Sequence, residues 1–212
     1  MEDGYLGEAI GRQFSPVLQF QHRDVKSVHL PLETGFHNLA IVASKQRYPR
    51  QARKTALGLL GAGQMMFLKS IIVIDPEQNP KDLEALLDAM NDKVEISEDI
   101  IILEGMVADS LDAASPFENV QDKIIIDATT IPSSDPRSNS EPLEGSFSQE
   151  TPKWRQGLEN SPKFTSIEEV MKLSDVSDAR MLRDNMLVVT IDIENTPSPK
   201  TGSAESNDAS EK

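Results

Sequence analysis

The chain has 212 residues and a formal net charge of -14, with 26% charged and 38% hydrophobic residues. This length suits one domain with a hydrophobic core, and a second full domain is not expected. The acidic charge and the 5% aromatic content argue against a nucleic-acid partner, because phosphates are repelled and few rings are present to stack on bases. The absence of cysteine excludes disulfides, thiolate catalysis and cysteine-bound zinc.

The N-terminal sequence MEDGYLGEAIG is acidic and lacks the basic start and apolar stretch of a secretion signal. No apolar run approaches the roughly 20 residues that a membrane-spanning helix needs. We therefore expect a soluble, cytoplasmic chain without a membrane span.

The beginning of the chain predicts two helices with two strands between them. The stretch LGEAIGRQFSPVLQFQ predicts an amphipathic helix that Pro16 kinks or restarts. The stretches VKSVHLP and HNLAIVASK predict strands around a turn at Glu33, Thr34 and Gly35. Helical spacing in YPRQARKTALGLLGAGQMMF then predicts a helix whose first turn contains Pro49.

The following part continues the alternation of strands and helices. KSIIVID predicts a strand, PEQNPKDLEALLDAMNDK a helix capped by Asn79, and DIIILEG another strand. A loop is predicted over Asp109–Pro116 and a returning strand over Lys123–Ala128. This pattern predicts an α/β fold over residues 1–131, a layered domain with a mostly parallel or mixed sheet flanked by helices.

The composition changes after Pro132. Residues 132–163 are rich in Ser, Pro, Glu and Asn and predict a disordered linker, and residues 194–212 predict a disordered tail. Between them, residues 164–193 predict one or two short helices and a strand. A capping box of Ser166 and Glu169 starts the first of these helices, and the strand follows the alternation over Leu187–Ile193.

Five basic residues gather near one predicted helix start in this acidic chain: Lys45, Arg47, Arg50, Arg53 and Lys54. The helix dipole disfavours cations at that end, so the placement has a cost. One interpretation is an anion anchor for a phosphate or carboxylate, or a charged contact with an acidic partner. The alternative is a solvated helix face whose charges pair with neighbouring carboxylates.

Glycines in LGLLGAG raise the alternative hypothesis of a nucleotide-binding protein that uses Gly58 to Gly63. The spacing differs from the G-x-G-x-x-G pattern, and the glycines lie within a helical pattern instead of after a strand. Glycines in such a place more often permit close packing against a neighbour.

Three histidines, His22, His29 and His37, form no pair with metal-ligand spacing, so no metal site is predicted from them. His29 and His37 could face each other across the turn at Glu33. They would then be either a pH-sensitive pair or ordinary surface residues.

The carboxylates best placed for chemistry are Glu33, Asp75, Asp109, Asp112 and Asp127. Ligand clefts in open α/β sheets lie at the carboxyl ends of strands, so Asp75 and Asp127 suit a site if their strands are parallel. The alternative is that these residues cap helices and form turns.

Two segments of this chain together resemble the C-terminal part of the UbiD-type decarboxylases, the 3-octaprenyl-4-hydroxybenzoate carboxy-lyases. The first is RYPRQARKTALGLLGAGQMMFLKSIIVIDPEQNPKDLEALLDAMNDKV, and the second is DSLDAASPFENVQDKIIIDAT. The resemblance runs from about Gly7 to Thr129. The residues that mark the family in the second segment are Asp112, Ser115, Pro116, Lys123, Asp127 and Thr129.

The resemblance implies non-oxidative decarboxylation of aromatic or unsaturated carboxylic acids, a class that includes 4-hydroxybenzoate-type precursors of ubiquinone biosynthesis. It implies prenylated flavin mononucleotide, a divalent metal and potassium in the complete enzyme. The catalytic, flavin-binding and metal-binding residues of the family belong to parts that this sequence does not contain. No catalytic residue and no metal ligand is therefore assigned here, and no cofactor is expected on this chain alone.

The expected role is that of a C-terminal domain or subunit that closes the substrate pocket and contributes to a homo-oligomer. Its implied partner is the flavin-binding N-terminal domain or subunit, and the candidate pocket edge is Glu33, Thr34, Gly35 and His37. The alternative is a stand-alone assembly or regulatory module without catalytic activity.

Overall fold

The computed structural model describes residues 2–35, 38–110, 112, 115, 117–135, 166–173, 176–184 and 186–191. It divides into two compact units. The first contains residues 1–163 and the short segment Arg183–Met186, and the second contains Phe164–Leu182 and Leu187–Lys212. Most of the predicted linker and all of the predicted tail lie outside the described residues.

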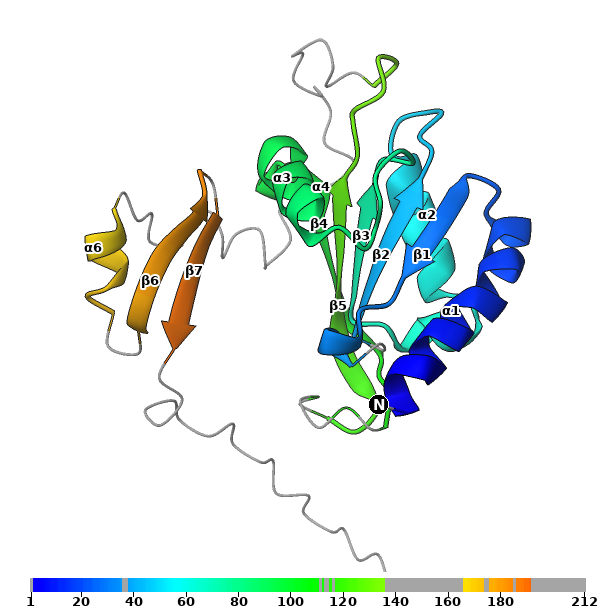
Figure 1. Cartoon of the computed structure of the whole chain (residues 1–212), viewed down its shortest axis with the longest axis horizontal. Helices are drawn as coiled ribbons and strands as arrows, with labels where there is room; N and C mark the ends of the chain where they lie inside the picture. Colours follow the sequence, from blue (N-terminus) through cyan, green and yellow to red (C-terminus); the bar gives the residue numbers. More distant parts are fainter. Residues whose placement is uncertain are drawn as a thin grey trace, which may run out of the picture. The chain divides into compact units, whose positions relative to one another are not determined.

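The first unit is built on a sheet of five strands in the order β1-β2-β3-β5-β4 (Figure 1). The three central strands β2, β3 and β5 are parallel, and the outer strands β1 and β4 run antiparallel to their neighbours. The prediction of a layered α/β domain with a mixed sheet is thus confirmed. The strands are β1 Val25–His29, β2 Leu39–Ser44, β3 Ser70–Ile74, β4 Ile100–Val107 and β5 Val120–Ala128.

Helices cover both faces of this sheet because its central strands carry apolar side chains on both sides (Figure 1). Along β2, Ala40 and Val42 pack in one core with residues of α1 and α2, while Ile41 and Ala43 pack in a second core with Leu86 of α3. Burying each large aliphatic side chain contributes about 1.5–3 kcal/mol. The helices of this unit are α1 Glu2–Gln21, α2 Gln51–Leu60, α3 Leu83–Lys93 and α4 Ile96–Asp99, with 3-10 turns η1 Leu32–Thr34 and η2 Gly63–Phe67.

Helix α1 runs through Pro16 without a restart, one of the two outcomes that the sequence left open. Two later helix starts differ from the sequence predictions. Helix α2 begins at Gln51, after Arg50 in the left-handed conformation (φ 64°), so Pro49 precedes the helix. Helix α3 is capped by Asp82, whose Oδ1 accepts a hydrogen bond from the Ala85 amide at 3.1 Å. Asn79 instead accepts from the Lys81 amide within a turn, which removes it from the capping position.

The second unit contains helix α6 Ile167–Val170 and a hairpin of β6 Val176–Arg183 with β7 Met186–Ile191. The Ser166 half of the predicted capping box is confirmed, because Ser166 Oγ accepts a hydrogen bond from the Glu169 amide. Strand β6 was not predicted because its charged and polar residues show no apolar alternation. Within the part of the chain that the structure describes, no helix has the length and hydropathy needed to span a bilayer.

Candidate functional site

The parallel strands give the sheet two distinct edges. Their carboxyl ends form one edge, called here the carboxyl edge, and their starts form the opposite amino edge. Asp75 directly follows β3, and Asp127 lies near the end of β5 opposite Val73 of β3. Because β3 and β5 are parallel, the condition for both carboxylates to lie at the carboxyl edge is met.

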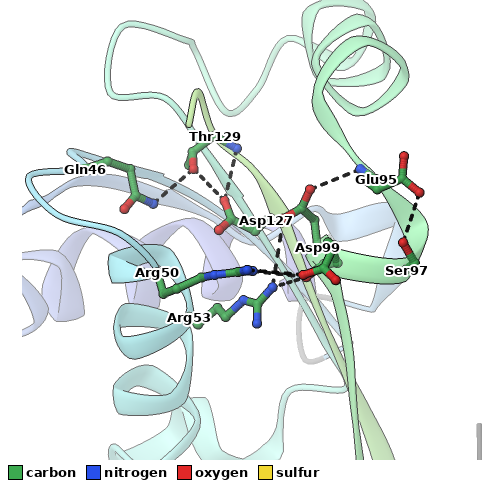
Figure 2. Close-up of polar contacts among 9 residues, drawn as sticks. Gln46, Arg50, Arg53, Glu95, Ser97, Asp99, Asp127 and Thr129 are labelled. Atoms are coloured by element: carbon green, nitrogen blue, oxygen red, sulfur yellow. Dashed lines mark hydrogen bonds and ion pairs between the residues drawn. The ribbon is translucent and has the colours of Figure 1, made fainter. Parts of the chain in front are cut away.

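Asp127 is a buried carboxylic acid with 6% of its surface exposed. Its Oδ1 accepts hydrogen bonds from the amide (3.2 Å) and the hydroxyl (2.5 Å) of Thr129, and Gln46 donates to that hydroxyl at 3.0 Å (Figure 2). Burial raises the pKa of Asp127, and nearby Asp99 adds to this, while the Thr129 hydrogen bonds and Arg53 act in the opposite direction. The net pKa is raised, because desolvation disfavours the charged form.

Asp75 lies in a more polar environment at the same edge. Lys93 Nζ is 2.7 Å from its Oδ2, and Thr130 donates through its amide (2.9 Å) and its hydroxyl (2.6 Å). Burial acts to raise the pKa of Asp75, but the bonds from Lys93 and Thr130 together outweigh it and lower the pKa. Asp75 therefore remains charged and joins β3, α3 and the segment after β5.

The structure divides the predicted basic cluster. Arg50 and Arg53 both point toward α4 (Figure 2): Arg50 pairs with the Glu98 carboxylate at 3.2 Å, and Arg53 donates to the Glu98 carbonyl and lies 4.0 Å from Asp99. The other pairing joins Arg47 Nε to Asp24 Oδ1 at 2.6 Å.

All three arginines thus have carboxylate partners within the fold, as in the alternative interpretation of the cluster. The remaining two members are exposed lysines. Lys54 lines a hollow beside α1, and Lys45 follows β2.

The predicted turn at Glu33 lies before β2 and therefore at the amino edge. It forms the 3-10 turn η1, which ends at Gly35 with φ 70°. The Thr34 hydroxyl donates to the Pro31 carbonyl at 2.9 Å, and Asn38 Nδ2 donates to the Thr34 carbonyl at 2.7 Å. His37 lies outside the described residues, so the proposed pairing of His29 with His37 stays a prediction.

Asp112 and Ser115 of the family-marking segment reach the same amino edge. Lys69 Nζ lies 2.7 and 2.6 Å from the two carboxylate oxygens of Asp112, and the Ser115 hydroxyl donates to this carboxylate at 2.8 Å. The Lys69 amide also donates to the Asn38 carbonyl, next to the η1 turn. Segments far apart in the chain thus meet here. Pro116 lies outside the described residues.

Lys123 is the largest fully buried side chain of the described residues, with 0% of its surface exposed. Its Nζ donates to the carbonyls of Met66 (2.8 Å) and Leu68 (2.5 Å), at the end of η2. Burial lowers the pKa of Lys123, because desolvation disfavours the ammonium form. The lysine therefore fixes η2 to β5 and takes a structural position in this chain.

The glycines of LGLLGAG lie at the end of α2, not at a helix start. The Gly61 amide donates a hydrogen bond to the Leu57 carbonyl, and Gly63 adopts a left-handed conformation with φ 49°. A Cβ at Gly58 would lie 2.3 Å from His22 Cε1, so this glycine permits close packing of the histidine ring. The arrangement offers no helix N-terminus for a phosphate and does not support the nucleotide hypothesis.

Sequence reasoning missed the hydrogen-bond and ion-pair partners of the candidate carboxylates and of Thr129. Lys69 and Lys93 hold Asp112 and Asp75, and Gln46 and Asp99 adjoin Thr129 and Asp127. No pattern in one sequence links a lysine to an aspartate 43 positions away, as for Lys69 and Asp112. Only the strand order brings them together.

These features define an α/β domain whose polar residues mainly join its own segments. The model of the family described as the 3-octaprenyl-4-hydroxybenzoate carboxy-lyase C-terminal domain matches residues 4–128. The chain therefore belongs to this family, that of the UbiD-type decarboxylases, and the predicted resemblance is confirmed.

Curated relatives match the same part of the chain. An uncharacterized protein of Aquifex aeolicus is 43% identical over 129 residues, which are 61% of this chain and 26% of that protein. An uncharacterized protein of Archaeoglobus fulgidus is 38% identical over 129 residues, which are 61% of this chain and 27% of that protein. The chain thus spans about a quarter of the length of these relatives.

Solved structures of larger enzymes share the fold. Vanillic acid decarboxylase of Sedimentibacter hydroxybenzoicus is similar in its open form, with 26% identity and a TM-score of 0.53 over 67% of this chain and 30% of that chain. Its closed form is 26% identical, with a TM-score of 0.53 over 74% of this chain and 30% of that chain. The UbiD-class enzyme HmfF of Pelotomaculum thermopropionicum, in complex with FMN, shows the same fold at 24% identity and a TM-score of 0.54, over 65% and 30%.

Proposed function

We propose that this chain is the C-terminal domain or subunit of a cytoplasmic, UbiD-like carboxy-lyase that acts on aromatic or unsaturated carboxylic acids. Its role is to close over a flavin-binding domain, exclude water from the reacting carboxylate and contribute to oligomer contacts. The observation that carries this proposal is the family match over residues 4–128. Alone, the chain should release no carbon dioxide from these acids.

The closing movement is supported by a relative. The vanillic acid decarboxylase of Sedimentibacter hydroxybenzoicus is known in an open form and in a closed form, and this chain is similar to a part of both. The substrate of that enzyme is an aromatic acid, which supports the proposed substrate class. A rigid α/β layer with two packed cores suits such a movement, because it can move without changing its internal packing.

The cofactors belong to the partner in this proposal. Among the described residues, no group of three or more His, Asp or Glu side chains is placed to hold a metal ion. At the two sheet edges, Lys69 forms an ion pair with Asp112, and Lys93 forms one with Asp75. The proposal therefore places prenylated FMN, the divalent metal and potassium on the flavin-binding domain or subunit, and assigns no reaction step to a residue of this chain.

A reconstitution experiment tests the role in catalysis. The Archaeoglobus fulgidus relative would be produced with prenylated FMN but without the segment that matches this chain, and this chain would be added separately. Carbon dioxide release from vanillic acid and related aromatic acids would be measured with and without it. We expect activity only with both parts. Equal activity without this chain would contradict the closing role.

The mass of the mixture, measured by light scattering, separates the two function hypotheses. Assembly with restored activity supports the enzyme subunit. Assembly that leaves activity unchanged supports the alternative of a module that only organises the oligomer. Neither assembly nor activity would contradict both.

The candidate pocket edge is tested in the same assay. Glu33, Thr34, Gly35 and His37 remain our proposed edge, supported by the position of the η1 turn beside Lys69 and Asp112. We expect Glu33→Gln to lower kcat/KM of the reconstituted enzyme. Glu77→Gln is the matched control, because Glu77 is an exposed glutamate that follows β3 at the opposite edge. Equal effects of the two substitutions would exclude the pocket role.

A further inference from the structure

A hollow of about 250 Å³ lies where the end of α1, the connection from α1 to β1 and the first turns of α2 meet. Its walls are mostly polar, and Phe20, with 82% of its surface exposed, borders it. The hollow lies within the first unit, so its walls belong to one packed body. It adjoins the carboxyl edge, because the Asp24 carbonyl in its wall accepts hydrogen bonds from the Lys45 amide and the Ser44 hydroxyl at the end of β2. None of the family-marking residues lines it.

The basic side chains that line this hollow are His22, Arg23 and Lys54. Neither Arg23 nor Lys54 forms an ion pair with another residue of the described part of the chain. The carboxylate in the wall is Asp24, and it is already engaged by Arg47 at 2.6 Å and by the Gln51 amide. The hollow therefore has an excess of positive charge in a chain with a net charge of -14.

His22 lines the hollow together with Lys54. Its ring is placed against Gly58, where any side chain would displace it. Burial and then the charge of Lys54 lower the pKa of His22. A bound anion would reverse the second effect, because it would stabilise the imidazolium form.

We propose that this hollow binds a small oxyanion, the phosphate or carboxylate group of a small molecule, between Lys54, Arg23 and His22. The guanidinium and ammonium groups would form charge-assisted hydrogen bonds to its oxygens. The site uses Lys54, a member of the basic cluster that is not one of the paired arginines. The proposal is independent of the proposed decarboxylase role.

Proton NMR of the full chain tests this proposal directly. The sequence contains only three histidines, and His22→Gln assigns the His22 ring signals. Inorganic phosphate and acetate would be titrated separately at constant ionic strength, because salt alone screens surface charges. We expect a saturable shift of the His22 signals and a higher pKa of His22 in the bound state, with little change at the other two histidines.

Substitutions separate the site from general charge attraction. We expect Lys54→Gln to weaken anion binding about tenfold or more, since charge-assisted hydrogen bonds contribute that much. Lys45→Gln is the matched control, because it removes the same charge from an exposed lysine outside the hollow, and affinity should stay unchanged. If Lys54→Gln does not fold, Arg23→Gln replaces it.

The two anions identify the ligand class. Saturable binding of phosphate alone assigns a phosphoryl group, binding of acetate alone assigns a carboxylate, and binding of both supports a general oxyanion site. The proposal is overturned if neither anion shifts the His22 signals, or if Lys54→Gln and Lys45→Gln bind with equal affinity.

Discussion

Lys123 carries an amino group that water does not reach, and two peptide carbonyls are its hydrogen-bond partners. A lysine in such a place would be costly if those partners were missing, because a buried polar group without a hydrogen bond loses its hydration. The two carbonyls have the same requirement. Lys123 and the end of η2 therefore depend on each other.

We expect Lys123→Met to lower the free energy of unfolding by about 2 kcal/mol, because two buried carbonyls lose their donor while the apolar stem is kept. Urea unfolding followed by circular dichroism would measure the change. Lys26→Met, at an exposed lysine of β1, is the control and should change stability little. A variant as stable as the original chain would show that the carbonyls find other donors.

Asp127 predicts a pH dependence with a defined sign. Its folded-state pKa is raised above the usual value of 3.8, so the folded state binds the proton more tightly than the unfolded state. The resulting stabilisation is fully present below pH 3.8 and is lost as the pH rises through the folded-state pKa.

We therefore expect the original chain to lose stability relative to Asp127→Asn as the pH rises above 3.8. Asn can still accept the Thr129 hydrogen bonds, but it does not titrate. Urea unfolding at several pH values would measure the difference, with Glu77→Gln as the control for net charge. A stability difference independent of pH would contradict the raised pKa.

His22, the residue directly after α1, packs against Gly58 of α2. Replacing a helical glycine by alanine normally stabilises a helix by about 1 kcal/mol. Here the new Cβ would lie 2.3 Å from the histidine ring, which must move. The two substitutions should therefore not be additive.

A double-mutant cycle makes this quantitative. We expect Gly58→Ala to stabilise the chain in the His22→Ala background and to give little or no gain when His22 is present. The coupling energy should be about 0.5–1 kcal/mol, as for residues in direct contact. Thermal unfolding of the four chains would measure it. The same effect of Gly58→Ala in both backgrounds would contradict the contact.

The five strands of the first unit were predictable from sequence because the residue types that form them are local signals, whereas β6 lacks such a signal. Runs such as Ile71 to Ile74 are apolar and β-branched and are covered on both faces, as their composition indicates. Helix caps were less predictable. Asn79 and Asp82 are both capping residue types, and only the path of the chain decides that Asp82 caps α3.

The site residues show a similar division between local and long-range information. The position of Asp75 and Asp127 at one edge followed from parallel strands. The pairs of Lys69 with Asp112 and of Lys93 with Asp75 join residues that are distant in sequence, so local patterns could not identify them. Of these two pairs, the one with Lys93 helps to lower the pKa of Asp75.

The first unit has what an independent domain needs. Its two cores lie on opposite faces of one sheet and include residues from β2, β3 and β5. The predicted domain boundary at residue 131 stays a prediction, and truncation tests it.

We expect a chain of residues 1–135 to unfold cooperatively in urea, with a slope that reflects its smaller size. Circular dichroism is the suitable probe, because the only tryptophan is Trp154 and is absent from this fragment. The full chain, examined at the same wavelength, is the reference. A broad transition without cooperativity would show that the fold needs the rest of the chain.

Strand β5 is the last of the five strands in the chain, yet it lies between β3 and β4. A nascent chain that has emerged only as far as Asn119 therefore has no partner for one side of β3 and no contact between β4 and the rest of the sheet. Apolar strand edges of this kind attract other chains. The interval before β5 leaves the ribosome is thus the period when this domain is most exposed to aggregation, and chaperones would protect it most effectively then.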